Sequence, residues 1–543
     1  MTTPTHERLN DVLAAVLFLV LAPLVAHLLF SWIGFNPTDD GFILAYSRRV
    51  LGGQMPHRDF ISIRPVGSAV LHAPALLLGG DRAFWLSRGF VWFQFAVIAW
   101  VWVGMLAKAL AWPLGRAARV VLALVAFVLS AHSFPMMAWH TTDGLFLCSL
   151  GLALCLREGR GARMAGCVLV GLACLCKQNF AAMVPVALVA TGEWRRVTSW
   201  LAAAAPAVAY VCILLLGNAL PDAWVQMRSQ TGLFRAGVRP YVGAIPFPAG
   251  VALGAAIAAA LASRAVEARR LGVLALYAAP AGFIAMVAAG YHFEAPALGL
   301  MGVAVGATGW QLEGGRAALR RLAVPVALLC LAWVASVSLG YNSPVLVAGP
   351  LGVLLVGYAE TVPGGGEDGT LRRLRVLGTV ALAVAAVCSG WVLRRERVYL
   401  DRPARELTKP LGGVLPGLRG IHTSFATRAA LDDLAAVVEQ IGERPYAIVP
   451  DFPAWWVCSG RPNPLPIDWA QGTELASPRA MARVLESIER QRGTLVVIVQ
   501  KFDARFLELG LDPLPKTYRF HVAQHVRRRM RKTGETRFFE VYE

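Results

Sequence analysis

The stretch NPTDDGFILAYSRRVLGGQMPHRDF, residues 36–60, follows the first long apolar run of the chain and begins with two adjacent carboxylates, Asp39 and Asp40. Charge beside hydrocarbon costs free energy, so acidic residues at the edge of a membrane are candidates for function. The apolar run before them, about residues 12–33, is too long for a signal-peptide core and lacks an A-x-A cleavage site after it. We therefore expect a retained first transmembrane helix with both carboxylates at its outer end.

The whole chain has the composition of a membrane protein. Of its 543 residues, 56% are apolar and 16% are charged, against about 25% charged residues in an ordinary soluble domain. Apolar runs of about 18–22 residues, the length that crosses a bilayer as a helix, recur along the sequence. About thirteen spans are predicted, near residues 11–33, 88–107, 118–136, 143–157, 163–177, 180–192, 198–217, 244–262, 271–290, 295–311, 322–340, 344–359 and 376–393.

The positive charges indicate how these spans are oriented. The net charge is +18, but the arginines occur in short clusters between apolar runs, which argues against a nucleic-acid partner. With the N-terminus in the cytoplasm, every inward loop holds at least two Lys or Arg residues, and the short outward loops near 132–142, 291–294 and 341–343 hold none. This pattern predicts a membrane protein with a cytoplasmic N-terminus and a C-terminal part outside the cytoplasm. The dense basic run HVRRRMRK, residues 525–532, is expected to be a solvated or lipid-facing surface.

The chain is predicted to have two parts. Residues 1–393 form the transmembrane module, and its first outward loop, residues 34–87, carries the two acids and two short interfacial helices that each end at a Gly-Gly pair. Residues 394–543 form a small α/β domain. In that domain YAIVP and TLVVIVQ are typical of buried strands, each preceded by a helix, and RFFEVYE predicts a last strand.

Spans that are far apart in the sequence send polar residues to the same outer rim. These residues combine acids, histidines and cations, which a purely structural protein has little need for. They are His57, Arg58, Asp59 and Arg64 in the first outward loop, His140 and Asp143 in the second, Lys177 and Gln178 at a helix end, Arg235 in the loop 218–243, and His292 and Glu294 in a tight turn.

Each of these residues also has a local explanation. Asp39 or Asp40 suits the N-terminus of a helix, where a carboxylate caps the backbone and opposes the dipole, although a cap accounts for one of the two better than for both. The other local explanations are contacts of His57, Arg58 or Arg235 with lipid headgroups, an N-cap by Asp143, a Lys177 side chain that extends to the interface, and a turn held by His292 and Glu294.

An outward carboxylate near cations and interfacial helices fits the transfer of a sugar from a lipid phosphate. Nucleotide sugars are not readily available outside the cytoplasm, so an activated sugar has to arrive on a lipid. A carboxylate that takes the proton from the acceptor hydroxyl contributes about 10²–10⁴-fold to the rate. Lys or Arg placed in advance stabilises the charge that develops on the leaving phosphate. A single displacement of this kind inverts the anomeric centre.

The same stretch resembles the first-loop signature of the GT-C membrane glycosyltransferases. In that signature an acidic pair is followed by a tyrosine and then by Gly-x-x-Pro-Tyr-x-Asp-Phe. Tyr46, Gly53, Pro56 and Asp59 fit, and His57 stands where Tyr is usual. HTTDGLFL and GLACLCKQNF follow in the expected order, GYHFEAPAL resembles the later HY-x-x-P segment, and VPDFPAWWVCSGRPNPLP resembles the start of the outer domain. The layout is similar to the aminoarabinose-transferring and protein O-mannosylating branch.

The resemblance implies a polytopic α-helical GT-C fold with about thirteen transmembrane helices and a small C-terminal α/β domain. It implies a polyprenyl-phosphate sugar donor, Asp39 as the catalytic base, Asp143 as a supporting acid and Lys177 as a phosphate partner. The acceptor would be a glycan, a glycolipid or a protein. Many relatives work without a metal, although Asp39 and Asp40 are also able to recruit a divalent ion, as in some branches.

Roles are also predicted for the remaining rim residues. Asp40 would support Asp39 or orient its loop, and the donor phosphate would bind Lys177 together with arginines of the outward loops, Arg58, Arg64 or Arg235. Contacts with the substrates are predicted for the other polar and aromatic residues of the rim, which are Tyr46, His57, Asp59, His140, Gln178, His292 and Glu294.

A polytopic transporter or flippase for a lipid-linked or anionic substrate is the alternative from another class, because charged rims also serve substrate entry. A transporter more often has charges or broken helices near the midplane of paired halves. This sequence has mainly rim charges and no evident repeat. A non-catalytic scaffold would explain the spans but would leave the polar rim without a role.

Overall fold

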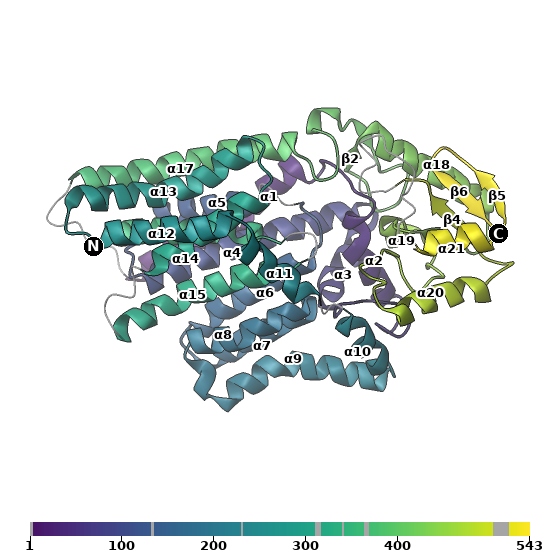
Figure 1. The fold of residues 1–543 in the computed structure, drawn as a ribbon, viewed down its shortest axis with the longest axis horizontal. Coiled ribbons are helices and arrows are strands. Elements are labelled where there is room, and N and C mark those ends of the chain that lie inside the picture. The colour runs from purple at the N-terminus through teal and green to yellow at the C-terminus, as the bar shows by residue number, and fades with distance from the viewer. Residues whose placement is uncertain are drawn as a thin grey trace.

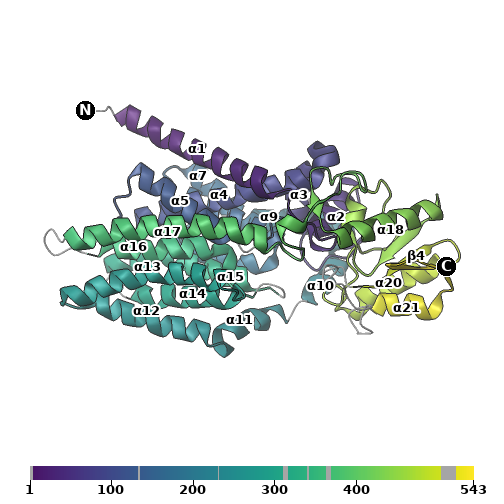
Figure 2. The same cartoon turned by 90° about the horizontal axis from the view of Figure 1, so that it is seen from above.

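A computed structural model describes residues 4–131, 135–229, 232–309, 316–338, 342–362, 369–502 and 521–543. The molecule is an elongated bundle of helices with a small α/β domain at one end (Figure 1). The N-terminus lies at the end of the bundle opposite this domain in both views (Figures 1 and 2). The predicted class, a polytopic α-helical protein with a small C-terminal α/β domain, is confirmed.

Each predicted span coincides with a helical segment, because apolar residues along a run can either pack inside the bundle or face hydrocarbon. The segments are α1 (Pro4–Phe30), α4 (Ala83–Ala109), α5 (Arg116–Ala131), α6 (His140–Cys155), α7 (Arg160–Cys176), η2 with α8 (Gln178–Ala182 and Met183–Ala190), α9 (Val197–Leu216), α12 (Pro246–Ala262), α13 (Val266–Ala288), α14 (Glu294–Thr308), α15 (Arg316–Ser336), α16 (Ala348–Thr361) and α17 (Gly369–Glu396).

Not all of these helices are long. Within the described ranges, five segments are long and apolar enough to cross a membrane on their own, and one bent pair of helices would add a sixth. The five are Leu9–Phe30, Gly67–Ala109, Val197–Leu216, Val266–Ala288 and Gly369–Glu396, and the bent pair is Phe234–Gly243 with Pro246–Ala262. The other apolar helices are shorter, so they complete the bundle by packing against the long ones.

Among the described residues, the segments predicted as long outward loops contain four further α-helices. They are α2 (Asp39–Leu51), α3 (Gly67–Gly79), α10 (Leu220–Arg228) and α11 (Leu233–Gly243). Ten of the thirteen residues of α2 are buried, because the C-terminal domain covers the side of α2 that the bundle leaves open. A Cβ atom on Gly41 would lie 2.1 Å from the backbone nitrogen of Ala454, so only glycine allows this close approach. Helix α2 therefore lies between the bundle and the outer domain, whereas α3 keeps Leu77 and Leu78 exposed.

The C-terminal domain is built on a four-stranded sheet in the order β3-β4-β6-β5, in which β3 and β4 are parallel and the other pairs are antiparallel. The buried strands and the helices that precede them confirm the predictions from YAIVP, TLVVIVQ and RFFEVYE. The elements are α18 (Phe425–Ile441), β3 (Tyr446–Val449), α19 (Pro453–Cys458), α20 (Pro478–Arg490), β4 (Val496–Gln500), α21 (His521–Arg529), β5 (Lys532–Glu535) and β6 (Phe539–Tyr542).

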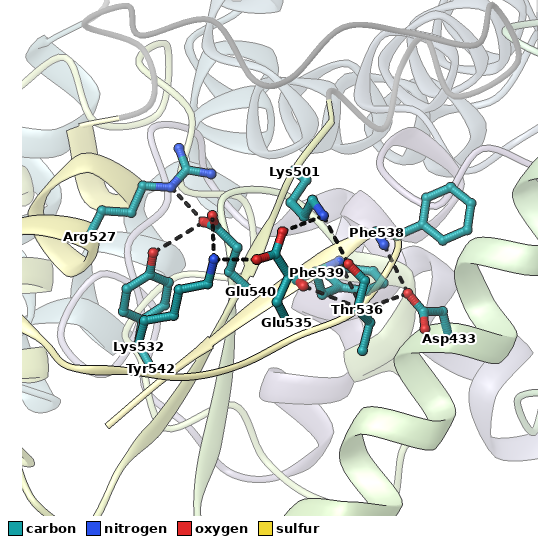
Figure 3. A network of polar contacts seen from close by, with 10 residues as sticks. All are labelled: Asp433, Lys501, Arg527, Lys532, Glu535, Thr536, Phe538, Phe539, Glu540 and Tyr542. Carbon is teal, nitrogen blue, oxygen red and sulfur yellow. Dashed lines mark hydrogen bonds and ion pairs between the residues drawn. The ribbon is translucent and has the colours of Figure 1, made fainter.

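Surface ion pairs hold the β5–β6 edge of this sheet (Figure 3). Glu535 accepts hydrogen bonds from Lys501 and Lys532, and these bonds lower the pKa of its carboxyl to about 2. Arg527 of the basic run pairs with Glu540 at 2.7 Å. The basic run thus lies on the surface of the outer domain, where exposed pairs of this kind add little stability.

A buried ion pair fixes the outer domain to α2. Arg49 donates from Nε and Nη2 to the two carboxylate oxygens of Asp468, at 2.6 and 2.8 Å, and from Nη2 to the carbonyl oxygen of Leu465. Both side chains of the Arg49–Asp468 pair are buried. The neighbouring Arg48 is exposed, so of these two adjacent arginines it is Arg49 that binds the C-terminal domain.

The Arg49→Met variant is expected to loosen the outer domain. Removal of one partner leaves Asp468 buried without its counter-charge, which typically costs about 3–5 kcal/mol. Hydrogen exchange at residues 465–468 and limited proteolysis between α17 and the outer domain would measure the change. Arg48→Met is the matched control and should behave like the wild type. Equal protection in the two variants would show that the Arg49–Asp468 pair does not hold the domain.

Candidate functional site

Asp39 is the first residue of α2 and is 5% exposed. Its Oδ2 accepts a hydrogen bond of 2.5 Å from the hydroxyl of Tyr399, which follows α17. The cap of α2 comes from another residue, because Asn36 Oδ1 accepts the backbone N–H groups of Thr38 and Asp39. A capping role therefore does not account for the carboxylate of Asp39, which points to Tyr399 instead.

Asp40 is bound differently from its neighbour. Its Oδ1 accepts from Nη2 and Nε of Arg88, at 2.9 and 3.3 Å, and its Oδ2 accepts from the backbone N–H of Asn36. Arg88 also donates to the carbonyl oxygens of Ser31 and Gly34. Asp40 thus joins the end of α1, the start of α2 and the start of α4, which suits the predicted supporting role.

The two carboxylates have different partners. Within the described ranges, no group of three or more His, Cys, Asp or Glu side chains is arranged to hold a metal ion. The pair Asp39 and Asp40 on its own would offer a divalent ion two carboxylate groups, one of which Arg88 already engages.

Three cationic or titratable side chains, Arg64, His140 and Lys177, influence one another electrostatically and are called the basic cluster here. The Arg64 guanidinium carbon lies 5.8 Å from the centroid of the Phe42 ring, and the His140 ring lies 6.3 Å from it. The charge of Arg64 acts on both Lys177 and His140. Since Phe42 lies one helical turn after Asp39, the basic cluster is close to the start of α2.

Lys177 is the least compensated charge of the cluster. It is 2% exposed, and its Nζ donates to the hydroxyl of Thr141 at 3.1 Å. Arg64 by contrast has a carboxylate partner, Glu474 of the outer domain, at 2.9 Å. Burial raises the pKa of the Glu474 carboxyl, and Arg64 opposes that rise.

The basic cluster is surrounded by polar atoms that are buried and have no hydrogen-bond partner among the described residues. Such atoms are rare in folded proteins because each costs about 1–3 kcal/mol. The set contains both donors and acceptors, so it suits a ligand with several polar groups. Its members are Arg64 Nε, His140 Nδ1, Thr142 Oγ1, Gln178 Oε1, Trp469 Nε1 and Glu474 Oε2.

Asp143 lies in a separate network behind the cluster. Its Oδ1 accepts hydrogen bonds from His72 at 3.0 Å and from Gln94 at 2.7 Å, and the residue is fully buried. Since Asp143 lies in the first turn of α6, directly after Thr141 and Thr142, this network fixes the helix end that carries the partner of Lys177.

Three predicted residues of the first loop are held by protein partners. His57 has a left-handed backbone with φ of 68°, and its Nδ1 and Nε2 lie 3.1 Å from Gln226 Oε1 and 2.7 Å from the Tyr210 hydroxyl. Asp59 accepts the backbone N–H of Met55 and pairs with Arg58. Arg58 also donates to the carbonyl oxygen of Gly217 at the end of α9. Together they join the loop to α9 and α10.

Acidification is expected to weaken this junction. Burial lowers the pKa of His57, so the folded protein binds this proton less readily than the unfolded chain. The free energy of unfolding therefore falls as the pH drops below about 6.5, the pKa of histidine in the unfolded chain. The charged groups facing His57 are Arg483, which donates to its carbonyl oxygen, and Asp222.

The measurement is the midpoint temperature of thermal unfolding between about pH 7.5 and about pH 5.5. This range includes the pKa of an unperturbed histidine. His57→Asn should give a flatter pH profile, because Asn does not titrate and tolerates the left-handed backbone. An unchanged slope in this variant would assign the pH dependence to another group.

The other predicted residues are spread around the same end of the molecule. Tyr46 is buried in α2 and donates to the carbonyl oxygen of Ile61, and Gln178 Nε2 donates to that of Ile63. Arg235 and His292 are exposed, on α11 and beside α14, and no described hydrogen bond or ion pair joins them to the basic cluster. Glu294 begins α14. The structure thus brings Arg64, His140, Lys177 and Gln178 together and leaves Arg235, His292 and Glu294 apart.

Several residues of the site were not predicted from the sequence. Tyr399 and Glu474 come from the C-terminal part, and their partners are 360 and 410 residues away in the chain. Arg88 lies at the start of a predicted span, and a charge in that position is itself a signal of function. Trp469, whose ring lies 4.4 Å from that of Phe42, has no local signature.

No protein-family model and no curated protein sequence matches the chain. Among solved structures, it is similar to the crystal structure of ArnT from Cupriavidus metallidurans bound to undecaprenyl phosphate. The two are 14% identical, the match covers 99% of this chain and 98% of that chain, and the TM-score is 0.41. A likeness at this identity and score does not decide an activity, which has to follow from the chain's own residues.

Proposed function

We propose that the protein is an inverting glycosyltransferase that moves a sugar from a polyprenyl-phosphate donor to an acceptor hydroxyl at the outer face of the bacterial inner membrane. The observation that carries the proposal is the basic cluster, with its buried Lys177, beside the helix that begins at Asp39. The N-terminus would be cytoplasmic and the outer domain periplasmic, since they lie at opposite ends of the bundle (Figure 1).

The basic cluster is suited to the phosphate of the donor. A buried lysine with a hydroxyl partner is destabilising unless an anion compensates its charge. The charges of Lys177 and Arg64 repel each other, and an anionic phosphate bound beside them would offset this repulsion. In a site shielded from water these cations would stabilise the charge that develops on the leaving phosphate oxygen.

Asp39 is suited to the role of general base. Its carboxylate would take the proton of the acceptor hydroxyl while the acceptor oxygen bonds to the anomeric carbon. The bond from that carbon to the phosphate oxygen breaks, and its electron pair leaves with the polyprenyl phosphate. The Tyr399 hydroxyl holds the carboxylate in place through its 2.5 Å hydrogen bond. Asp40, bound by Arg88, keeps the helix start fixed.

The test is turnover by the full-length protein in lipid nanodiscs. It would be supplied with a panel of polyprenyl-phosphate sugars and total membrane lipids and glycans, and released polyprenyl phosphate would be measured. Release that requires both donor and acceptor is the expected result. Movement of a labelled polyprenyl-phosphate sugar across the bilayer without release would contradict the proposal and identify a flippase.

A further inference from the structure

An apolar groove runs along the membrane part of the bundle, between α1, α4, α5 and α17. Its volume is about 340 Å³. Helix α1 forms one wall and lies at the edge of the bundle (Figure 2). All the side chains that line this apolar groove are apolar or glycine except one, Arg394. The lining includes Leu21, Val25, Trp92, Phe127 and Trp391.

Arg394 lies near the outer end of α17 and gives the groove a positive end. Its guanidinium carbon is 4.9 Å from the centroid of the Trp92 ring, and Nη2 donates to the carbonyl oxygen of Ala131. Its Nε is buried and has no partner among the described residues. A charge in an apolar span is costly and marks a functional position. Here it would pair with an anionic group at the head of an apolar chain.

The groove leads to the proposed base. A second, small cavity of about 40 Å³ shares Phe30 and Arg394 with the groove and is also bounded by Asp40, Arg88 and Tyr399. Tyr399 is the residue that donates to Asp39. The lipid chain in the groove would therefore place its headgroup beside Asp39. Arg64 and His140 of the basic cluster are near the start of the same helix, but they lie beside Phe42 and do not line the groove.

We infer that the apolar groove binds the acceptor, and that this acceptor is a lipid with an anionic headgroup that carries a hydroxyl. The inference rests on the proposed function, in which the acceptor is the molecule whose hydroxyl receives the sugar. The donor phosphate is already provided for by Lys177 and Arg64, and the hydroxyl that Asp39 deprotonates belongs to the acceptor. Two separate cationic positions, Arg394 and the basic cluster, match a reaction between two anionic lipids. Ordinary bilayer lipid would fill an apolar groove without needing a charge at its end.

Photo-labelling of the full-length protein in nanodiscs tests this inference. The probes are phosphatidylglycerol and phosphatidylcholine with the same diazirine-bearing acyl chain, together with a diazirine-bearing farnesyl phosphate. Mass spectrometry of peptides would locate the labels. Phosphatidylglycerol, which has a net negative charge and carries hydroxyls, is expected to label the groove faces of α1 and α17 about tenfold more than phosphatidylcholine, because the choline cation offsets the phosphate charge of the latter.

Two variants, each with a matched control, test the charge of the groove and the space inside it. Arg394→Gln removes the charge that lies over Trp92, and the control is Arg395→Gln, at an exposed arginine that lies over Trp391 of the same lining. Val387→Trp fills the groove, and Val384→Trp, also exposed on α17 but outside the lining, is its control. Each test variant should lower groove labelling about tenfold, and each control should leave it unchanged.

Three results would overturn the inference. They are equal labelling by the two phospholipids, equal labelling of Arg394→Gln and Arg395→Gln, and displacement of phosphatidylglycerol from the groove by farnesyl phosphate, which would make this the donor's groove. Labelling needs no sugar transfer. Release of polyprenyl phosphate without anionic preference in the groove would leave the proposed function intact and remove this inference alone.

Discussion

Asp39→Asn is expected to lower sugar transfer by about 10²–10⁴-fold, the contribution of a general base, in a protein that remains folded. Asn has nearly the same shape and still accepts a hydrogen bond from the Tyr399 hydroxyl, so the contact with the segment after α17 persists. It cannot take a proton from an acceptor hydroxyl. Released polyprenyl phosphate measures the activity, and thermal unfolding measures whether the fold is kept.

Asp40→Asn is the matched control, one residue away in the same helix. Asp40 faces Arg88 in a buried pair, and loss of its charge leaves Arg88 uncompensated, at a cost of about 3–5 kcal/mol. We expect lower stability for Asp40→Asn and unchanged stability for Asp39→Asn. Wild-type turnover in Asp39→Asn would remove this residue from the chemistry.

Lys177→Met is expected to abolish most of the activity while the protein becomes as stable as the wild type or more stable. A cation aimed at developing charge contributes about 10²–10³-fold to the rate. The same cation is buried with Thr141 as its hydrogen-bond partner, so an apolar side chain of similar length removes a destabilising charge. Opposite effects on activity and stability distinguish a functional lysine from a structural one.

The measurement pairs the rate of donor turnover with thermal unfolding. Lys108→Met is the control, because Lys108 lies in the last turn of α4 and is exposed. It should change neither quantity. If Lys177→Met unfolded, or turned over donor at the wild-type rate, the lysine would be a structural residue and the phosphate would need another site.

The parts of this molecule that the sequence predicts are those set by local patterns. Long apolar runs specify helices, and the runs YAIVP and TLVVIVQ specify buried strands, because each pattern matches the period of one element. Asp39 stands out for a similar reason, since an acid at the end of an apolar run has few structural uses. In the structure Asp39 begins α2, and Lys177 follows the last residue of α7.

The contacts between distant segments could not be predicted. The Tyr399 hydroxyl reaches Asp39 across 360 residues, and Arg49 and Asp468 are 419 apart. Nothing local distinguishes Arg49, which is buried, from Arg48, which is exposed. The sequence predicts that helix α2 lies in the membrane interface. In the structure ten of its thirteen residues are buried, because the C-terminal domain packs on the side that the bundle leaves open, and only the assembled fold reveals this packing.

Under the proposed function, the burial of α2 beneath the C-terminal domain would also affect which acceptors arrive, and by which route. Ala454 packs against Gly41 and Trp469 against Phe42, so this interface would have to open before a molecule from solution reached this side of α2. If opening it costs the about 3–5 kcal/mol of the Arg49–Asp468 pair, only about one molecule in 10²–10⁴ is open at a given moment. A water-soluble acceptor would have to wait for that state, whereas a molecule diffusing in the plane of the bilayer would not. Under the proposed function, the domain interface would thus favour acceptors that diffuse within the bilayer over acceptors that diffuse in solution.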